Sequence, residues 1–184
     1  MDKKKIKQAV KELLEAIGED SNRRELRKTP ERIANMFEEI LSGRIKDARD
    51  VLKVKHNLHH DEMIIVKDVP FYSMCEHHLL PFFGKCHVAY IPEDNKIVGV
   101  SRLSEVIDIS SKKLQIQERL TTEIADSIMK HLRPKGVGVV IEARHLCMEM
   151  MGVKQPGTNV ITSVVRGIFR KDMKTREEFL RLIK

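Results

Sequence analysis

Hydrophobic residues recur every three or four positions through the first part of the chain, which is the spacing of one helix face. A first stripe ends before Gly18, a residue typical of helix ends, and comprises Ile6, Val10, Leu13, Leu14 and Ile17. A second stripe follows Thr29-Pro30, the expected N-cap and first-turn proline, and stops at Gly43; it comprises Ile33, Met36, Phe37, Ile40 and Leu41. The sequence therefore predicts two helices that pack together.

Beyond residue 60 the pattern changes, and short apolar segments predict strands. Four strands are expected, over residues 63–66, 85–91, 137–148 and 159–169. Pro92-Glu93-Asp94-Asn95 supplies turn residues after the second of them. Because these strands come in sequential pairs and do not strictly alternate with helices, the sheet should be largely antiparallel.

Helical spacing returns between the two strand pairs and at the end of the chain. Ser101 is the expected N-cap of one helix, and a longer helix has the stripe Ile116, Leu120, Ile124, Ile128 and Leu132. Thr175-Arg176-Glu177-Glu178 predicts a capping box for a short last helix. The expected fold class is α+β, with a four-stranded antiparallel sheet and helices on one face over residues 61–184, after an N-terminal helical extension over residues 1–60. The open face and edges of such a sheet favour a homo-oligomer.

Composition agrees with one globular domain and its extension. The chain has 184 residues, 41% hydrophobic and 33% charged, and its net charge of +7 favours anionic partners. Aromatic residues make up only 4% and Trp is absent, so a nucleic-acid partner is not expected. The start of the chain has no apolar h-region and the longest apolar runs are strand-sized, so we expect no membrane association and a cytoplasmic protein.

The chemistry concentrates in two short segments. Cys75 and His78 are three residues apart, a spacing at which one turn can aim both side chains at a single ion, and thiolate and imidazole are ligands that zinc prefers. Cys147 follows His145 by two residues in an expected strand, so both should lie on one strand face. Three protein ligands are the number typical of a catalytic zinc site. Buried cysteines are also common as small hydrophobic residues, and spacing alone does not choose between these readings.

Other cysteines and histidines have simpler interpretations. Cys86 alternates with its neighbours as a packed strand residue would, and His87 lies on the opposite face of that strand. Three cysteines are an odd number, so free thiols are expected rather than a disulfide framework. The histidines at 56, 59 and 60 could form a second metal site, but a solvated loop is the favoured interpretation.

Several segments together resemble the GTP cyclohydrolase I family, in order and nearly without gaps. The match begins near Thr29-Pro30-Glu31-Arg32-Ile33-Ala34 and covers almost the whole chain. Its further motifs are Ser73-Met74-Cys75-Glu76-His77-His78, Gly84-Lys85, Tyr90-Ile91-Pro92, Gln115-Ile116-Gln117-Glu118-Arg119-Leu120, His145-Leu146-Cys147-Met148 and Thr175-Arg176-Glu177-Glu178-Phe179-Leu180.

The resemblance implies a tunnelling fold, in which subunits join their sheets into rings and two rings form a decamer. It also implies a Zn2+ ion held by the residues at Cys75, His78 and Cys147, an active site between subunits, and no redox cofactor. The implied substrate is a guanine nucleotide: the imidazole ring of GTP is opened at C8, formate is released, and the product recloses as 7,8-dihydroneopterin triphosphate.

The chemistry of that reaction suits the residue types present. Attack of water at C8 requires N7 to accept a proton, so His145 is the expected catalytic acid and His77 a second proton carrier. Glu118 would accept two hydrogen bonds from the guanine edge, with Gln117 beside it. Without the resemblance, Gln117 and Glu118 would be read as a solvated helix face.

The chain departs from the family at positions that bind phosphate. Ser101 and Arg102 are retained at a helix N-terminus and Arg32 is in place, but the resemblance predicts basic residues where this sequence has Asn35, Glu105 and Met151. Exchanging Arg for Glu replaces attraction to phosphate by repulsion. One alternative is therefore the same ring opening on a guanine derivative with fewer or no phosphates. A second alternative is a non-catalytic, zinc-containing oligomeric binding protein.

Overall fold

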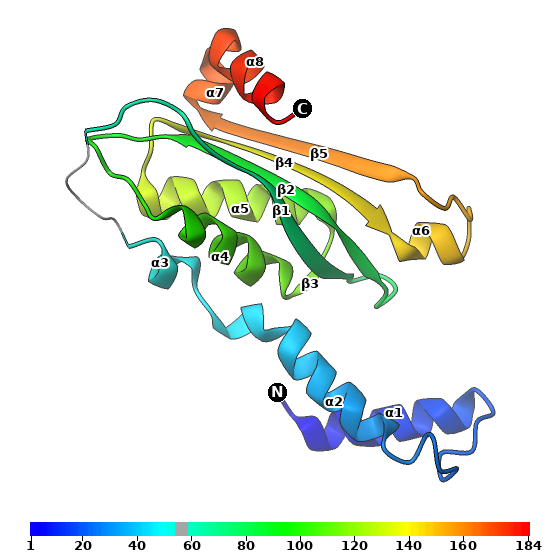
Figure 1. Cartoon of the computed structure of the whole chain (residues 1–184). Helices are drawn as coiled ribbons and strands as arrows, with labels where there is room; N and C mark the ends of the chain where they lie inside the picture. Colours follow the sequence, from blue (N-terminus) through cyan, green and yellow to red (C-terminus); the bar gives the residue numbers. More distant parts are fainter. Residues whose placement is uncertain (54–58) are drawn as a thin grey trace. The chain divides into compact units, whose positions relative to one another are not determined.

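A computed structural model describes residues 1–53 and 59–184 (Figure 1). Contacts divide the chain into two compact units, Met1–Ser42 and Gly43–Lys184. The predicted extension to residue 60 stays a prediction, although contacts place the division after Ser42. Of the three clustered histidines, His56 lies outside the described residues, whereas His59 pairs through Nδ1 with the Asn95 side chain at 2.8 Å.

The first unit is a pair of packed helices, as the stripes predict. Helix α1 spans Lys3–Ala16, and the Asp2 side chain caps it by accepting from the Lys5 N–H. Helix α2 spans Thr29–Ile40 and has Pro30 in its first turn. The predicted N-cap at Thr29 is wrong, because the helix already includes this residue and Lys28 occupies the cap position without a side-chain hydrogen bond.

The second unit is built on a five-stranded sheet in the order β3-β1-β2-β4-β5 (Figure 1). The four long strands are antiparallel, as predicted. They are β1 Ile64–Cys75, β2 Pro81–Ile91, β4 Gly136–His145 and β5 Asn159–Gly167. The fifth strand, β3 Leu114–Gln115, was not predicted, because two residues have no readable period; it runs parallel to the end of β1.

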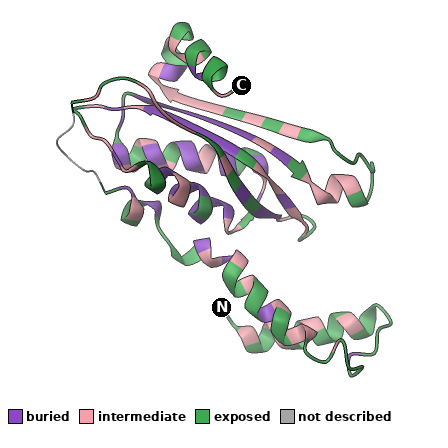
Figure 2. Cartoon of the chain, viewed as in Figure 1, coloured by how far each residue is buried: buried purple, intermediate pink, exposed green. Residues whose placement is uncertain are grey.

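Helices α4 Val100–Ser111 and α5 Gln117–Leu132 cover one face of this sheet. Purple segments in Figure 2 mark the buried residues of the sheet and of these helices. The main core contains Phe71, Phe82, Cys86, Tyr90, Leu103, Ile107, Leu120, Ile124, Ile128 and Ile141. The short 3-10 helix η1 Ser42–Ile45 precedes α3 Ala48–Val51, which contacts α4 and α5.

We predicted helices on a single face of the sheet, and this prediction needs correction. Helices α7 Ile168–Lys171 and α8 Met173–Leu182 pack on the opposite face at one end, through Phe169 and Phe179. Gly138 makes room for them, because a Cβ at this position would come within 2.8 Å of the Phe179 ring. Because Gly138 has no side chain, the Phe179 ring can pack directly against β4.

Three predicted element ends also differ from the structure. Gly99, not Ser101, occupies the N-cap of α4. Asp172, not Thr175, caps α8, since its carboxylate accepts from both the N–H and the hydroxyl of Thr175. Strand β4 stops at His145, and residues 146–150 form helix α6 Leu146–Met150. Among the described residues, no helix combines the length and apolar character needed to cross a bilayer.

Candidate metal centre and its surroundings

The structure brings Cys75, His78 and Cys147 together although 68 residues of chain lie between His78 and Cys147. One ligand atom from each lies within 4.8 Å of the others. The Cys75 Sγ is 3.8 Å from the His78 Nδ1. Cys75 is buried, Cys147 is half-buried and His78 is exposed, so the cluster opens toward solvent on the histidine side. Two sulfurs and one imidazole nitrogen at this separation suit a tetrahedral divalent ion with one free position.

A tight turn after β1 presents the first two of these side chains. Leu79 adopts φ of 53°, and its N–H donates to the Cys75 carbonyl at 2.9 Å, closing the turn. Arg119, on α5, forms an ion pair with Glu76 and donates to the Leu114 carbonyl at 3.0 Å. The turn is therefore fastened to both its own strand and the start of α5.

Cys147 reaches the cluster from a helix, so the prediction that it shares a strand face with His145 is wrong. The last β2 partner of β4 is Phe82, opposite His145, and the pairing with β5 ends one residue earlier. In the described part of the chain the pairing of β4 with β2 and β5 does not continue beyond His145, and the backbone turns into α6. The first turn of this helix carries Cys147 next to Cys75.

The two candidate thiols differ from the third in their surroundings. Burial, followed by the nearby Cys75 sulfur, raises the pKa of Cys147 above its ordinary value. Without a cation, therefore, the Cys147 sulfur favours its protonated form, and a bound metal would displace that proton. Cys86 has no such neighbours: it is fully buried in the core, where burial alone raises its pKa. This agrees with the interpretation of Cys86 as a packed residue.

His145 lies beside the cluster and is held on two sides. Its ring stacks on Phe82, with centroids 4.7 Å apart and planes inclined by 2°, and its Nε2 is 2.7 Å from the Oε1 of Gln117. Partial burial lowers the pKa of His145, while the Glu118 carboxylate opposes that shift. A neutral ring near neutral pH can accept a proton. His77 is exposed, 6.1 Å from His78 between ring centroids.

The remaining predicted site residues lie elsewhere on the chain. Ser101 and Arg102 are in the first turn of α4, whereas the far end of this helix adjoins β1, through a 2.7 Å bond from the Ser73 hydroxyl to the Ser111 carbonyl. At ~1.5 Å rise per residue, about 14 Å of helix separates them from that end. Arg32 belongs to α2 in the first unit. Within the second unit of one chain, then, the metal cluster is not brought together with Ser101 and Arg102.

The three altered positions have contrasting environments. The Glu105 carboxylate accepts two hydrogen bonds from the Arg102 Nη1, at 2.7 and 2.9 Å. Asn35 accepts from the Lys3 ammonium at 3.2 Å. Met151 is exposed at the end of α6. The guanidinium of Arg102 is thus paired with Glu105, the residue that stands where the resemblance predicts a basic side chain.

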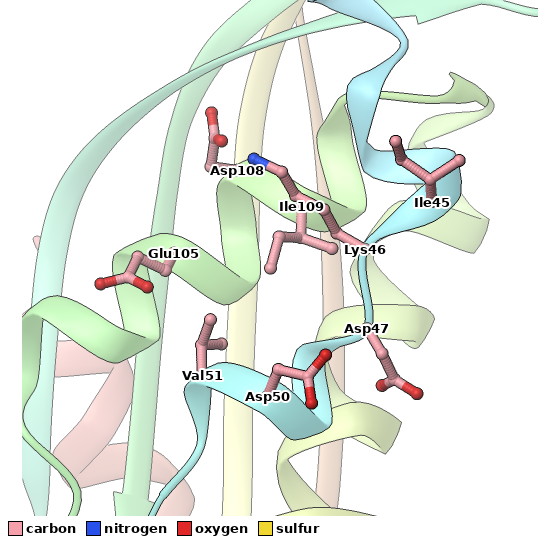
Figure 3. Close-up of a pocket in the computed structure, with 8 residues that line it drawn as sticks. All are labelled: Ile45, Lys46, Asp47, Asp50, Val51, Glu105, Asp108 and Ile109. Atoms are coloured by element: carbon pink, nitrogen blue, oxygen red, sulfur yellow. The ribbon is translucent and has the colours of Figure 1, made fainter. Parts of the chain in front are cut away.

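A separate pocket in the second unit has an acidic lining (Figure 3). It measures about 310 Å³ and is bordered by Ile45, Lys46, Asp47, Asp50, Val51, Glu105, Asp108 and Ile109. Four carboxylates against a single ammonium repel phosphate. None of the metal-cluster residues borders this pocket, so it does not extend the candidate site.

Sequence reasoning did not find two residues that support the candidate site. Phe82 touches His145 only because β2 and β4 are paired in this register, and Arg119 reaches Glu76 across a long loop closure. In the sequence, Phe82 is an apolar strand residue, and no pattern around it indicates contact with His145. Arg119 lies in one of the segments that resemble the family, but nothing in its spacing indicated Glu76 as its partner.

The fold and the cluster define an α+β protein with a candidate Cys-His-Cys metal site, and comparison with known proteins names the family. The family model described as GTP cyclohydrolase I matches residues 6–184, so the chain belongs to the GTP cyclohydrolase I family. It is 57% identical over 183 residues to GTP cyclohydrolase 1 of Caldanaerobacter subterraneus subsp. tengcongensis, covering 100% of this chain and 97% of that protein. It is 54% identical to the enzyme of the same name from Clostridioides difficile, with the same coverage.

A solved structure, the archaeosine synthase QueF-Like, is also similar. It matches 57% of this chain and 93% of its own length, with 16% identity and a TM-score of 0.45. Similarity at this level carries no argument about function.

Proposed function

We propose that this protein is a zinc-dependent GTP cyclohydrolase I, which opens the imidazole ring of GTP at C8 to give formate and 7,8-dihydroneopterin triphosphate. The observation that carries the proposal is the Cys75, His78 and Cys147 cluster with His145 beside it, in a chain that belongs to this family along its length. The reaction is a hydrolysis without net oxidation or reduction, so no redox cofactor is needed.

The donor atoms fit zinc better than a hard cation. Cys75 and Cys147 would supply thiolates and His78 an imidazole nitrogen, whereas magnesium and calcium prefer oxygen ligands. A zinc ion held there would lower the pKa of a water molecule toward neutrality. The retention of three free cysteines suits a reducing compartment, so we place the protein in the cytoplasm.

The protein residues then divide the remaining tasks. His145 would move the proton between the attacking water and N7 of the purine, and the exposed His77 would carry protons to solvent. Glu118, in the first turn of α5, would accept from N1–H and the exocyclic amine of guanine, an arrangement that adenine cannot match. Gln117 was expected to bind substrate as well, but its amide is buried and its oxygen faces His145, which supports a role in positioning that histidine.

The number of phosphates on the substrate is the point where a second candidate function has support. The Nη1 of Arg102 is paired with both carboxylate oxygens of Glu105, and the pocket that Glu105 lines adds the carboxylates of Asp47, Asp50 and Asp108. These contacts favour a guanine derivative with fewer or no phosphates over a triphosphate. The third candidate, a zinc-containing oligomeric binder without catalysis, has no such specific support.

The separation of site residues along one chain supports assembly as a homo-oligomer. Ser101 and Arg102 lie a helix length from the metal cluster, so a second subunit must bring a phosphate-binding end to each cluster if both contact one nucleotide. We propose a decamer, as the family resemblance implies, with guanine nucleotide bound between subunits and with no nucleic-acid or membrane partner.

One experiment distinguishes the three candidates. The zinc-loaded protein is incubated with GTP, GDP, GMP, guanosine and guanine, and formate release and pterin fluorescence after oxidation are recorded. Turnover of GTP well above guanosine supports the triphosphate reaction. The reverse order supports the second candidate, and formate from none of the five favours the binding protein.

A further inference from the structure

Gln117 is surrounded by hydrogen-bond acceptors at the start of α5. The side chain is 1% exposed. Its Nε2 lies 3.1 Å from the Ile141 carbonyl, 2.9 Å from the Val160 carbonyl and 3.1 Å from the Thr162 hydroxyl. Carbonyl oxygens only accept, so the nitrogen end of the amide must face them. Strands β4 and β5 therefore determine the orientation of this amide.

The oxygen end of the same amide faces His145. Gln117 Oε1 and His145 Nε2 are 2.7 Å apart. An amide oxygen carries no proton, so the hydrogen of this bond must be on Nε2. A neutral imidazole has a single N–H, and its other nitrogen, Nδ1, is then unprotonated. The tautomer of His145 follows from the position of two backbone carbonyls on neighbouring strands.

The surrounding contacts hold the Gln117 amide and the His145 ring in one orientation. The Thr121 hydroxyl donates to the Gln117 carbonyl at 2.7 Å and lies 2.6 Å from the Thr162 hydroxyl. Phe82 stacks on the imidazole and holds its plane. Turning the ring by half a revolution would place Cε1 where Nε2 stands, leaving a buried amide oxygen without a donor. Nδ1 has no hydrogen-bond partner within residues 1–53 and 59–184.

We propose that Gln117 is a positioning residue that holds His145 in its Nε2–H tautomer, so that Nδ1 is the atom that takes up and returns the proton during ring opening. The inference rests on the function proposed above. It assigns His145 a first role as proton acceptor, before the acid role expected from the sequence, and it withdraws Gln117 from substrate binding.

The proton balance of the step is simple. The oxygen of the attacking water bonds to C8 while its proton passes to Nδ1. The electron pair of the C8–N7 double bond moves to N7, and N7 then takes the proton from Nδ1. His145 finishes as it began, and the substrate has gained one water molecule.

The direct test is nitrogen NMR of the unaltered zinc-loaded protein. Solid-state spectra of sedimented protein labelled with 15N-histidine, above the ordinary histidine pKa of about 6.5, report which ring nitrogen carries hydrogen. The His145 signals are identified by their loss in His145→Asn. We expect hydrogen on Nε2 and none on Nδ1. Hydrogen on Nδ1, an even mixture, or hydrogen on both nitrogens would overturn the proposal.

A variant adds a kinetic readout. Gln117→Met removes the acceptor but keeps the side-chain length; we expect a mixed His145 tautomer, retained zinc, kcat lower by about tenfold or more, and KM within about twofold. A raised KM with unchanged kcat would mean that Gln117 binds substrate, and would overturn the proposal. If this variant does not fold, the spectrum of the unaltered protein still decides.

A matched control separates tautomer selection from general loosening. Gln115 is also fully buried, and its amide donates to the Ser110 carbonyl and to Glu123 without touching His145. Gln115→Met should leave the His145 spectrum unchanged; a change equal to that of Gln117→Met would overturn the specific role. Absence of formate from every guanine compound would remove the proposed function, but the spectrum would still report the tautomer.

Discussion

The three cysteines occupy two kinds of environment, and their neighbours decide what each sulfur can do. Cys75 and Cys147 meet each other and an imidazole at an opening to solvent. Cys86 lies opposite Ile141 in the middle of the sheet, within the hydrophobic core. At the scale of the single residue, metal binding therefore depends on paired donors and access, since a lone buried thiol remains protonated and inert.

This difference yields a prediction for three variants. Cys147→Ala should lose zinc and activity together, because the two ligands that remain, Cys75 and His78, are too few to hold the ion. His145→Ala should keep zinc at one ion per chain and lose ring opening by about 100-fold or more. Cys86→Ala, the matched control, should keep zinc and lower only stability, by about 1 kcal/mol. Elemental analysis and formate release measure the outcomes; unaltered turnover in His145→Ala would remove it from the mechanism.

The Arg102 and Glu105 pair gives a second prediction at this scale. Glu105→Gln should free the guanidinium and improve the use of GTP relative to guanosine by about tenfold, since an attraction to phosphate of ~1 kcal/mol or more is restored. Asp108→Asn is the control, because it removes the same charge from the same helix but from the Lys112 pair. Competition kinetics with both substrates measure the ratio, and an equal response in the two variants would contradict a specific effect of Glu105.

At the scale of elements, the ends of strands and helices place the chemistry. Strand β4 ends at His145, one residue after its last pair with β5, and helix α6 then delivers Cys147. The turn after β1 delivers Cys75 and His78, and α5 begins with Gln117 and Glu118. Strands β1 and β4 thus end, and helices α5 and α6 begin, at the same end of the sheet. Side chains from distant segments can meet there.

The cap of α8 makes a prediction about pH. Hydrogen bonds from the side chain and then the backbone of Thr175 lower the pKa of Asp172. A lowered folded-state pKa stabilises the fold above the unfolded value of about 3.9 and loses that effect as pH falls through the folded-state value. Asp172→Ala should therefore melt at a lower temperature than the natural chain at pH 7, with the gap closing below about pH 4.

A neutral cap separates the two contributions. Asp172→Asn can still accept from the backbone N–H, so its gap to the natural chain should be smaller, and the pH-dependent part of the cap should be absent. Thermal unfolding followed by circular dichroism across the pH range measures both variants. A constant gap for Asp172→Ala at all pH values would show that the carboxylate charge does not matter.

Close packing of β2 on β4 gives a third element-scale test. A Cβ on Gly84 would lie 2.7 Å from the Ala143 Cα and would also meet the Glu142 carbonyl, both backbone atoms. Gly84→Ala should destabilise the protein by about 2 kcal/mol or more. At Gly99 the nearest atom is 3.9 Å away, so Gly99→Ala serves as the tolerated control. Urea unfolding compares the two; equal stability would mean that the strands separate at little cost.

At the scale of the whole molecule, the sheet leaves surfaces for other copies. No strand in the described part of the chain pairs with the outer edge of β5, which is nine residues long. The face opposite α4 and α5 carries Tyr72, 72% exposed, stacked on Phe83, and Ile161, 63% exposed. Free strand edges and apolar sheet faces are usually covered by assembly.

Ile161→Lys tests that assembly. We expect smaller particles by light scattering and lost ring opening, with the circular dichroism of a folded subunit, because a buried ammonium would oppose association. Ile45→Lys is the control, since Ile45 is 91% exposed on η1, away from the sheet. Unchanged particle size in Ile161→Lys would contradict the proposed use of this face.

Much of the fold was predictable because its signals are local. Helical stripes, strand segments and the α+β class depend on neighbours within a few residues, and Cys75 with His78 formed a readable pair. The predicted caps at Thr29, Ser101 and Thr175 were wrong by one to three residues, since several nearby residues can serve as a cap. The two-residue β3 and the helix at Cys147 had no period to read.

The sequence by itself determined the chemistry available: two thiols and several imidazoles at spacings that suit zinc, and a family pattern along the chain. Only the tertiary structure decided that Cys147 meets Cys75 from a helix, that Phe82 and Gln117 hold His145, and that Glu105 occupies Arg102. The physical reason is that donor type is a property of the residue, whereas proximity across a sheet depends on strand register and on where each strand loses its partners.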